Sequence, residues 1–302
     1  MKTVVMTGGT SGLGEVAAQQ IFKTPNTRLL LGARGERRSS IDTLPLDLCS
    51  LASVRAFAQA VSEELGNTQI DVLVLNAGLQ FANLDQRTED GFETTFGVNH
   101  LAHYLLLRLL LPKLAQGATV VITTSDTHDP KRIPMAPTQL DPEWLAHPQV
   151  NGKKTGFSAG FRAYAASKLC NLLTARALAA SAEAKTRGFT VIAFNPGLTL
   201  GTSLFRGWPL WVRWMMGMVK LVRPMARLGT VAQAGQALAD LALGNITSPA
   251  GRIYASFVKR RVTWPDPSEL AQRDDVMNEL WRVSAEMVGL PERPLSEGLR
   301  VA

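Results

Sequence analysis

The chain has 302 residues, 46% of them hydrophobic and 19% charged, which predicts one large or two small globular domains and excludes global disorder. A net charge of +7 is compatible with nucleic acid, an anionic membrane surface or an anionic cofactor. The arginines are dispersed and no nucleic-acid-binding motif is present, so nucleic acid is the least favoured partner. Two distant cysteines and no signal-peptide pattern favour a reducing, cytoplasmic location.

Short apolar runs alternate along the chain with segments of helical length. The runs are residues 4–6, 29–33, 72–78, 119–125 and 190–197. The expected helices are residues 12–23, 51–65, 92–115 and 161–185. Continuously apolar strands that alternate with helices are typical of a parallel sheet covered on both faces. The sequence therefore predicts an α/β protein with one doubly wound domain over residues 1–302.

Two segments interrupt this alternation. Residues 126–160 contain five prolines and form a long connection of the kind that is either functional or disordered. Residues 204–228 are apolar but carry five basic residues, which indicates an amphipathic basic helix and not a membrane span. We expect residues 126–160 and 198–228 to cover a substrate. Packing of a dimer and peripheral membrane contact through 204–228 are alternatives for the second segment.

The first predicted strand is followed by the glycine-rich sequence TGGTSGLG at residues 7–14. In a doubly wound sheet the first strand–helix turn binds the pyrophosphate of a dinucleotide, because glycines let the backbone approach and the helix N-terminus offers free N–H groups. Gly8, Gly12 and Gly14 have this context. A tight turn that binds nothing is the alternative, since a glycine cluster alone is weak evidence.

Arg34 ends the second predicted strand, twenty residues after Gly14. An acidic residue near this position binds the ribose 2′-hydroxyl of NAD, whereas an arginine accommodates the 2′-phosphate of NADP. Arg37 and Arg38 follow, and a solvated arginine cluster is the alternative. The position of Arg34 favours NADP(H) as the cofactor.

Taken together, several motifs resemble the short-chain dehydrogenase/reductase family over residues 1–256. They are Thr7-Gly8-x-x-x-Gly12-x-Gly14, Asn76-Ala77-Gly78, Asn99, Ser125, Tyr164-x-x-x-Lys168 and Pro196-Gly197, in that order. The resemblance implies a Rossmann-type fold, a nicotinamide cofactor and hydride transfer between a carbonyl and an alcohol.

Tyr164 and Lys168 are the pair that carries this chemistry. Reduction of a carbonyl needs a proton donor beside the developing alkoxide, and a free tyrosine, with a pKa of about 10, is a poor one at neutral pH. Lys168 follows by one helical turn, on the same face, where its ammonium would lower the pKa of Tyr164. In isolation such a pair is an ordinary helix turn.

By resemblance, Tyr164 is the general acid, Lys168 also holds the nicotinamide ribose, Ser125 binds the substrate oxygen and Asn99 anchors a water that relays protons to Lys168. The further cofactor contacts implied are Gly8, Thr10, Ser11, Gly12, Leu13, Gly14, Arg34, Asp47, Leu48, Asn76, Ala77, Gly78, Pro196, Gly197, Leu198 and Thr199. From the residues alone, Asn99 is equally a helix-interior polar residue with a backbone partner, and Ser125 and Asn76 are turn formers.

The four histidines are not expected to bind metal. His100 and His103 have ligand-like spacing, but no carboxylate or cysteine completes a set, so we interpret them as helix-surface residues. His128 and His147 lie in the proline-rich connection. Cys170 is expected to be a small buried thiol, with a donor role toward substrate as the alternative.

Within the family, the sequence is similar to a branch that contains retinol dehydrogenases and light-dependent protochlorophyllide reductases. The resemblance implies an NADPH-dependent oxidoreductase of a bulky hydrophobic carbonyl or alcohol, and a homo-oligomer. Phe205, Trp208 and Trp211 are the expected apolar substrate contacts, together with Cys170. Light-dependent reduction of a tetrapyrrole double bond is the alternative activity. An NADP-binding sensor or scaffold is the non-enzymatic alternative.

Overall fold

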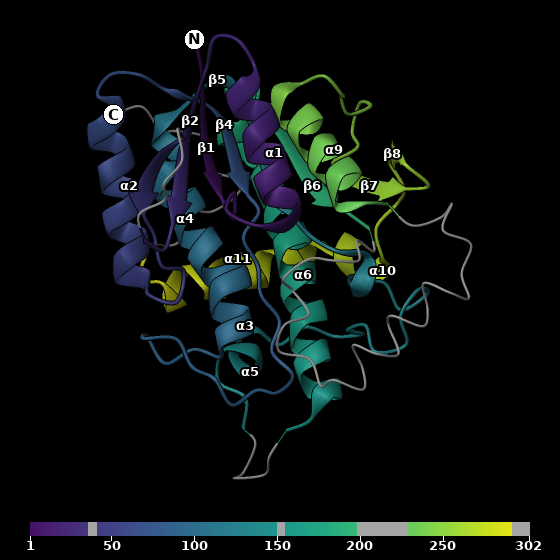
Figure 1. Ribbon diagram of the computed structural model, residues 1–302. Coiled ribbons are helices and arrows are strands. Elements are labelled where there is room, and N and C mark those ends of the chain that lie inside the picture. The colour runs from purple at the N-terminus through teal and green to yellow at the C-terminus, as the bar shows by residue number, and fades with distance from the viewer. Residues whose placement is uncertain (36–40, 150–154, 198–228, 292–302) are drawn as a thin grey trace.

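One eight-stranded sheet organises the molecule, with helices on both of its faces (Figure 1). The computed structural model describes residues 1–35, 41–149, 155–197 and 229–291. The strand order is β3-β2-β1-β4-β5-β6-β7-β8. Seven strands run parallel, and only β8 pairs antiparallel with its neighbour, β7. The predicted doubly wound α/β fold is therefore confirmed, with an antiparallel edge strand that the prediction did not contain.

The central strands are almost entirely buried, because helices cover both sides of them. The strands are β1 Lys2–Thr7, β2 Thr27–Ala33, β3 Asp42–Pro45, β4 Ile70–Leu75, β5 Leu114–Thr123, β6 Thr190–Asn195, β7 Tyr254–Val258 and β8 Arg261–Thr263. Every apolar run singled out in the sequence contains or overlaps one of these strands. The short strands β3, β7 and β8 were not predicted.

Two helices, α1 and α9, pack against one face of the sheet, and the other face carries α2, α4 and α6 (Figure 1). Helix α11 packs outside this second layer, against α6 and α5. The longer helices are α1 Gly12–Lys23, α2 Leu51–Leu65, α4 Ala102–Leu110, α6 Phe157–Ala180, α9 Val231–Leu243 and α11 Asp274–Met287. The short ones are α3 Thr94–Phe96, α5 Pro142–Ala146, α7 Ala182–Thr186 and α10 Glu269–Gln272.

The expected helix over residues 92–115 is divided in the structure. It consists of α3, a π-helical turn η1 at Gly97–Leu101, α4 and a 3₁₀ turn η2 at Leu111–Lys113, after which β5 begins. A π turn inserts one extra residue into a helix and is frequent at functional sites. Here it contains Asn99, one of the expected catalytic residues. The expected helix over 161–185 likewise divides, into α6 and α7.

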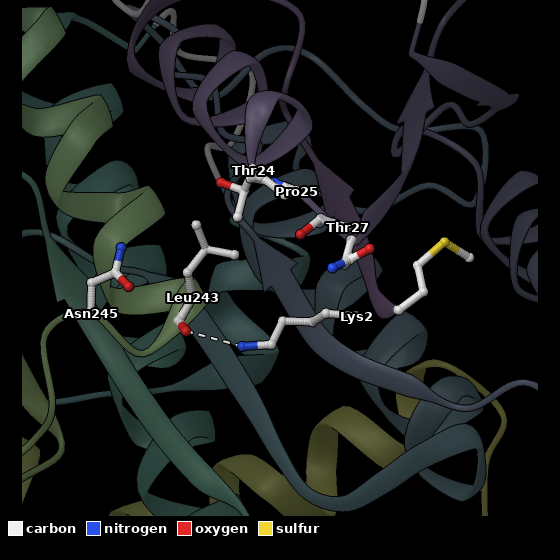
Figure 2. A pocket seen from close by; sticks show the side chains of 8 residues that line it. Lys2, Thr24, Pro25, Thr27, Leu243 and Asn245 are labelled. Atoms are coloured by element: carbon white, nitrogen blue, oxygen red, sulfur yellow. Dashed lines mark hydrogen bonds between the residues drawn. The ribbon is translucent and has the colours of Figure 1, made fainter.

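The strand N-termini form the edge of the sheet opposite the motif residues. A hollow at this edge is lined by Lys2, Thr24, Pro25, Thr27 and Leu243 among others, and the Lys2 ammonium donates to the Leu243 carbonyl at 3.0 Å (Figure 2). No catalytic or cofactor residue expected from the sequence lies in it. In the part of the chain that the structure describes, none of the helices combines the length and apolar character that a membrane span requires.

Candidate active site

The glycine-rich turn lies at the carboxyl end of β1, where the strand order reverses between β1 and β4. Such a switch point is where open α/β sheets bind ligands. Gly8 and Gly12 have positive φ of 68° and 58°, a conformation that glycine adopts without steric cost. A methyl group on Gly14 would lie 2.0 Å from the Gly8 carbonyl oxygen, so this position has no room for a side chain. Helix α1 begins at Gly12 and directs its N-terminus at this edge.

Thr7 and Asn76 join the first turn to the end of β4. The Thr7 hydroxyl accepts from the backbone N–H groups of Asn76 and Ala77, at 3.0 and 3.2 Å. The Asn76 amide donates to the Gly8 carbonyl at 3.1 Å, and its carbonyl oxygen accepts from the Thr123 hydroxyl at 3.0 Å. The motif residue Asn76 therefore fixes the shape of the dinucleotide turn from inside the protein.

His103 extends this network into the helix layer. Its Nε2 lies 2.9 Å from the Thr7 hydroxyl and its Nδ1 lies 3.1 Å from the Asn99 carbonyl oxygen. A carbonyl only accepts, so Nδ1 carries the proton and Nε2 accepts from Thr7. Burial lowers the pKa of His103 to about 4, which keeps the ring neutral. The predicted helix-surface location is wrong, because His100 and His103 are 1% and 2% exposed.

The side chain of Asn99 is fully buried and clamps the segment that follows Gly78. Its Oδ1 accepts from the Leu79 N–H at 2.8 Å, and its Nδ2 donates to the Leu79 carbonyl at 2.9 Å and to the Ser167 hydroxyl at 3.0 Å. These contacts support the interpretation of Asn99 as a polar residue with a backbone partner. Its role in a proton relay stays a prediction.

Tyr164 lies on α6, across from Ser125 at the end of β5. Burial raises the pKa of Tyr164 above its usual value, and the nearby Ser125 hydroxyl opposes this effect. The expected lowering by Lys168 is not found. The Lys168 Nζ lies 5.8 Å from the centre of the Tyr164 ring, so desolvation of the phenol dominates. The phenol therefore remains protonated at neutral pH.

Lys168 is 3% exposed, and its Nζ donates to the Thr123 carbonyl at 3.2 Å. Burial lowers the pKa of Lys168 to about 8. A methyl group on Gly78 would lie 3.1 Å from this Nζ and 3.4 Å from Asn99 Oδ1, so Lys168 and Asn99 both lie close to the backbone of Gly78. An ammonium has three donors, and Thr123 takes one of them. Among the described residues no other acceptor is found for this ammonium, which leaves donors that a ligand could use.

The other expected cofactor residues lie along the same edge of the sheet. Arg34 is exposed at the end of β2, and Asp47 and Leu48 follow β3, where Asp47 accepts from the Cys49 N–H at 2.9 Å. Pro196 and Gly197 follow β6, and a side chain on Gly197 would meet the Phe257 carbonyl at 2.5 Å. Thr10, Ser11 and Leu13 belong to the turn before and at the start of α1.

Five of the expected contacts, and the second of the two segments expected to cover the substrate, lie outside the described residues, whereas the first segment, 126–160, is described except for residues 150–154. The five contacts are Leu198, Thr199, Phe205, Trp208 and Trp211, within residues 198–228. Cys170 is fully buried in the core cluster, which confirms the buried thiol. It lies two residues after Lys168 on α6 and so points away from the Lys168 face. A role of Cys170 as a substrate contact stays a prediction.

Sequence reasoning missed the contacts of His103 and Thr123. For His103 a signal existed, because the surrounding residues 98–111 are apolar on every side of a helix, and such a helix is buried. For Thr123 no signal existed, since its contacts are made through the fold. Among the described residues, no group of three or more His, Cys, Asp or Glu side chains is placed to hold a metal ion.

The matching family model is that of the short chain dehydrogenases, over residues 2–136. The chain is 34% identical to the bovine protein "Dehydrogenase/reductase SDR family member 13" across 96% of its own length and 74% of that relative. It is 32% identical to human "Retinol dehydrogenase 12", with 96% and 87% covered. The chain belongs to the short-chain dehydrogenase/reductase family. These relatives support the retinol dehydrogenase-like branch, while light-dependent tetrapyrrole reduction stays a prediction.

Solved structures of short-chain dehydrogenases/reductases have the same fold. A protein from Mycobacterium paratuberculosis, itself uncharacterised, superposes with a TM-score of 0.68 at 25% identity, covering 96% of this chain and 94% of that one. NADPH-bound carbonyl reductase from chicken fatty liver gives 0.60 at 17% identity, with 88% and 94% covered. A 3-ketoacyl-(acyl-carrier-protein) reductase from Brucella melitensis, complexed with NADH, also gives 0.60, at 20% identity, with 85% and 97% covered. Cofactors of both types thus occur among the neighbours of this family member.

Proposed function

We propose that this protein reduces a bulky hydrophobic carbonyl with NADPH, in a reaction that is reversible. The observation that carries the proposal is the arrangement at the end of β5, where Tyr164, Ser125 and Lys168 lie together and, among the described residues, the Lys168 ammonium has one acceptor, the Thr123 carbonyl. This arrangement lies at the same edge as the glycine-rich turn and Asn76. A protonated phenol beside a cation is suited to donate a proton to a developing alkoxide.

Each residue has a distinct part in this reaction. The nicotinamide, when bound, supplies the hydride to the carbonyl carbon. Tyr164 gives its hydroxyl proton to the carbonyl oxygen, and the Lys168 ammonium stabilises the tyrosinate that remains. The Ser125 hydroxyl accepts the Thr127 N–H at 3.3 Å, so its own proton is left to donate to the substrate oxygen or to the tyrosinate. Burial keeps Tyr164 protonated at neutral pH, as a proton donor must be, and the Lys168 cation is proposed to offset the weaker acidity that burial gives the phenol.

The shape of the edge fits a nicotinamide dinucleotide. The turn at residues 8–14 brings bare backbone and the N-terminus of α1 to one place, as pyrophosphate binding requires. Lys168 lies against the backbone of Gly78, where its unused donors are available to ribose hydroxyls. Similarity to retinol dehydrogenases supports an apolar substrate, because a relative of that name aligns over nearly the whole chain.

Replacement of Tyr164 by Phe is the experiment that tests this function. We expect NADPH-dependent turnover of a panel of apolar aldehydes and ketones, all-trans-retinal included, to fall by about 10²- to 10⁴-fold. Tyr104→Phe removes a hydroxyl that donates to the Trp281 carbonyl, outside the site, and serves as the matched control. Full turnover by Tyr164→Phe would rule out the proposed mechanism. Absence of turnover in the wild-type protein would favour the sensor or scaffold.

Arg34 is the residue that we propose selects NADP over NAD. It is exposed at the end of β2, beside the first turn, where a 2′-phosphate would meet its guanidinium. Arg34→Asp should raise the KM for NADPH by about 10- to 100-fold, as the loss of a charge-assisted hydrogen bond implies, and leave the KM for NADH much less affected. Lys23→Asp makes the same charge change at the opposite edge and is the control. Equal losses for both cofactors would contradict the assignment.

A further inference from the structure

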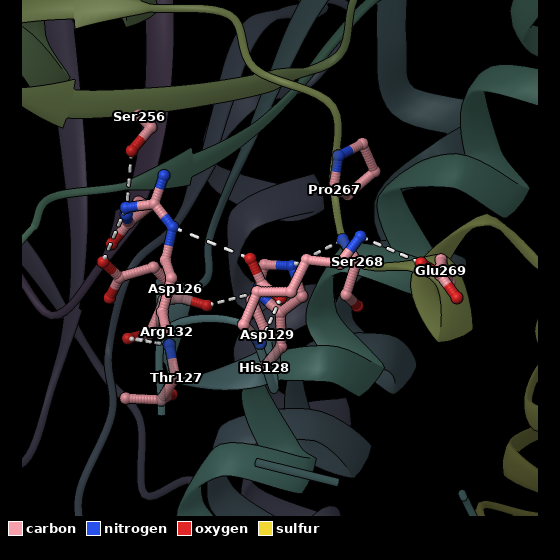
Figure 3. Close-up of polar contacts among 12 residues, drawn as sticks. Asp126, Thr127, His128, Asp129, Arg132, Ser256, Pro267, Ser268 and Glu269 are labelled. Carbon is pink, nitrogen blue, oxygen red and sulfur yellow. Dashed lines mark hydrogen bonds and ion pairs between the residues drawn. The ribbon is translucent and has the colours of Figure 1, made fainter. Parts of the chain in front are cut away.

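A buried histidine, His128, contacts the backbone carbonyl of Ser125. It ends the 3₁₀ turn η3 at Asp126–His128, which begins after Ser125 at the end of β5. Its side chain is 1% exposed, and the edge of its ring meets Tyr254 with centroids 5.3 Å apart. Figure 3 shows the ring between the η3 turn and the segment of Pro267 and Ser268. The proposed reaction assigns it no role.

Both ring nitrogens of His128 have partners, and the partners define the tautomer. Nδ1 lies 2.6 Å from the Ser125 carbonyl oxygen, and Nε2 lies 3.4 Å from the backbone N–H of Ser268. The carbonyl only accepts and the N–H only donates, so Nδ1 carries the proton and Nε2 is the acceptor. Burial lowers the pKa of His128, which is consistent with this neutral ring. The short Ser125 contact is the stronger of the two bonds.

The other contacts of the turn do not replace this bond. The backbone N–H of His128 lies 3.5 Å from the same Ser125 oxygen, at the limit of a hydrogen bond. Arg132 pairs with Asp126 and Asp129 at 3.5 and 3.7 Å, and its side chain is 44% exposed. Exposed ion pairs contribute little to fixing a conformation. Before Ser125, the backbone N–H and the hydroxyl of Thr124 are anchored to the Phe194 and Lys168 carbonyls at 2.8 and 2.6 Å. After Ser125, among the described residues, the short buried bond to its carbonyl comes from the His128 ring.

The peptide that follows Ser125 determines where its hydroxyl lies. That hydroxyl lies near enough to the Tyr164 phenol to lower its pKa, and it accepts from the Thr127 N–H within the same turn. A small rotation of this peptide would move both the hydroxyl and its Thr127 donor away from Tyr164. A displacement of about 1 Å in a reacting group can cost about 10²-fold in rate.

We propose that His128 is a positioning residue for the reaction, which holds the Ser125 peptide through its Nδ1–H and thereby aims the Ser125 hydroxyl at Tyr164 and the substrate oxygen. This inference rests on the proposed function. The bond from Ser268 to Nε2 has a different effect, because it ties the ring to the start of α10, where Ser268 caps the helix. Nδ1 therefore serves the reaction, through Ser125, and Nε2 serves the fold, through Ser268.

Two conservative variants distinguish these roles. In His128→Asn the side-chain amide nitrogen occupies about the position of Nδ1, so the donor to Ser125 is kept and the Ser268 contact is lost. In His128→Gln the longer side chain places its carbonyl oxygen near Nε2, so the Ser268 contact is kept and the donor to Ser125 is lost. Both side chains are polar, and folding is checked by near-ultraviolet circular dichroism and thermal unfolding.

We expect His128→Asn to retain kcat within about fivefold and His128→Gln to lose about 10- to 100-fold in kcat, with the KM for NADPH unchanged in both. The measurement is steady-state turnover well below the midpoint of unfolding, per folded molecule. Equal kcat values for the two variants, or the reverse order, would overturn the positioning role. If Tyr164→Phe is inactive and these variants do not differ, the inference alone fails. If Tyr164→Phe is fully active, the proposed function fails.

Discussion

Two neighbouring groups of polar residues at the carboxyl edge use their hydrogen bonds differently. The cofactor-side network comprises Thr7, Asn76, Asn99, His103 and Thr123, and its side chains bond to each other and to the backbone. The reaction-side group comprises Ser125, Tyr164 and Lys168, and among the described residues its Lys168 ammonium has one acceptor, the Thr123 carbonyl. The first group is satisfied without ligand and maintains the fold. The second is buried with unused hydrogen-bond donors, and its burial lowers stability for the benefit of catalysis.

This difference predicts opposite effects of substitution on stability and on activity. Residues of the cofactor-side network should be needed for stability more than for turnover at saturating cofactor. Residues of the reaction-side group should be needed for turnover, and Lys168 should also lower the free energy of unfolding, since the burial of its charge is unfavourable. Two measurements test this contrast, and a third tests the buried helix histidines; they follow in order of decreasing effect.

Lys168→Met should show the contrast most strongly. Turnover should fall by at least about 10²-fold, because the tyrosinate loses its cation. The free energy of unfolding at pH 7 should rise by about 1–3 kcal/mol, because burial that lowers the lysine pKa to about 8 disfavours the folded state while the group is charged. Denaturant unfolding and NADPH oxidation measure the two effects. Lys185→Met, on the exposed side of α7, is the control and should change neither. A less stable Lys168→Met protein would contradict the contrast.

Thr7→Val should give the opposite result. The isosteric change leaves the N–H groups of Asn76 and Ala77 and the Nε2 of His103 without a partner, and should cost about 2–4 kcal/mol of unfolding free energy. Turnover at saturating NADPH should fall by less than about tenfold. Thr7→Ser keeps the hydroxyl and should recover most of the stability. If Thr7→Ser is as unstable as Thr7→Val, the hydrogen bonds are not the cause.

Acid should weaken the fold through the two helix histidines. Burial lowers the pKa of His100 to about 3 and that of His103 to about 4, while both return to about 6.5 on unfolding. The unfolded chain therefore binds more protons than the folded chain below about pH 6.5. As the pH is lowered, the free energy of unfolding decreases by up to about 1.4 kcal/mol per pH unit for each histidine. Unfolding free energies between pH 7 and 5.5 measure this slope. In His100→Gln the slope should decrease by up to about 1.4 kcal/mol per pH unit, the contribution of one histidine, and an unchanged slope would rule out the assignment.

Much of the fold was predictable because buried parallel strands are continuously apolar and end in turn residues. That pattern found β1, β2, β4, β5 and β6 and placed their carboxyl ends together. It missed β3, a strand of only four residues, two of them polar, at the edge of the sheet. It also missed the β7–β8 hairpin, because the turn residues Lys259 and Arg260 have positive φ although neither is a glycine or an asparagine. These elements form because a neighbouring strand or helix covers them, which no local pattern records.

The candidate site was predictable in its residue types but not in its electrostatics. The spacing of Tyr164 and Lys168 predicted a shared helix face, and both lie close together in the structure. The spacing gave no measure of burial, which raises the pKa of Tyr164 and lowers that of Lys168. The Nε2 partners of His103 and His128, Thr7 and Ser268, come from segments far away in the sequence, and only the folded chain brings them together.

Helix α11 has a consequence for the order in which the protein is made. It covers α4 and α6 through the Tyr104 bond to the Trp281 carbonyl, the stacking of Arg108 on Trp281, and the Arg176–Asp274 ion pair. Ribosomes deliver this helix long after strands β1 to β6 and both helices beneath it have emerged. During synthesis the apolar surfaces of α4 and α6 that α11 later buries therefore stay exposed, and such surfaces bind chaperones and other nascent chains. Completion of the core, and with it the support behind the π turn of Asn99, is a late event in translation.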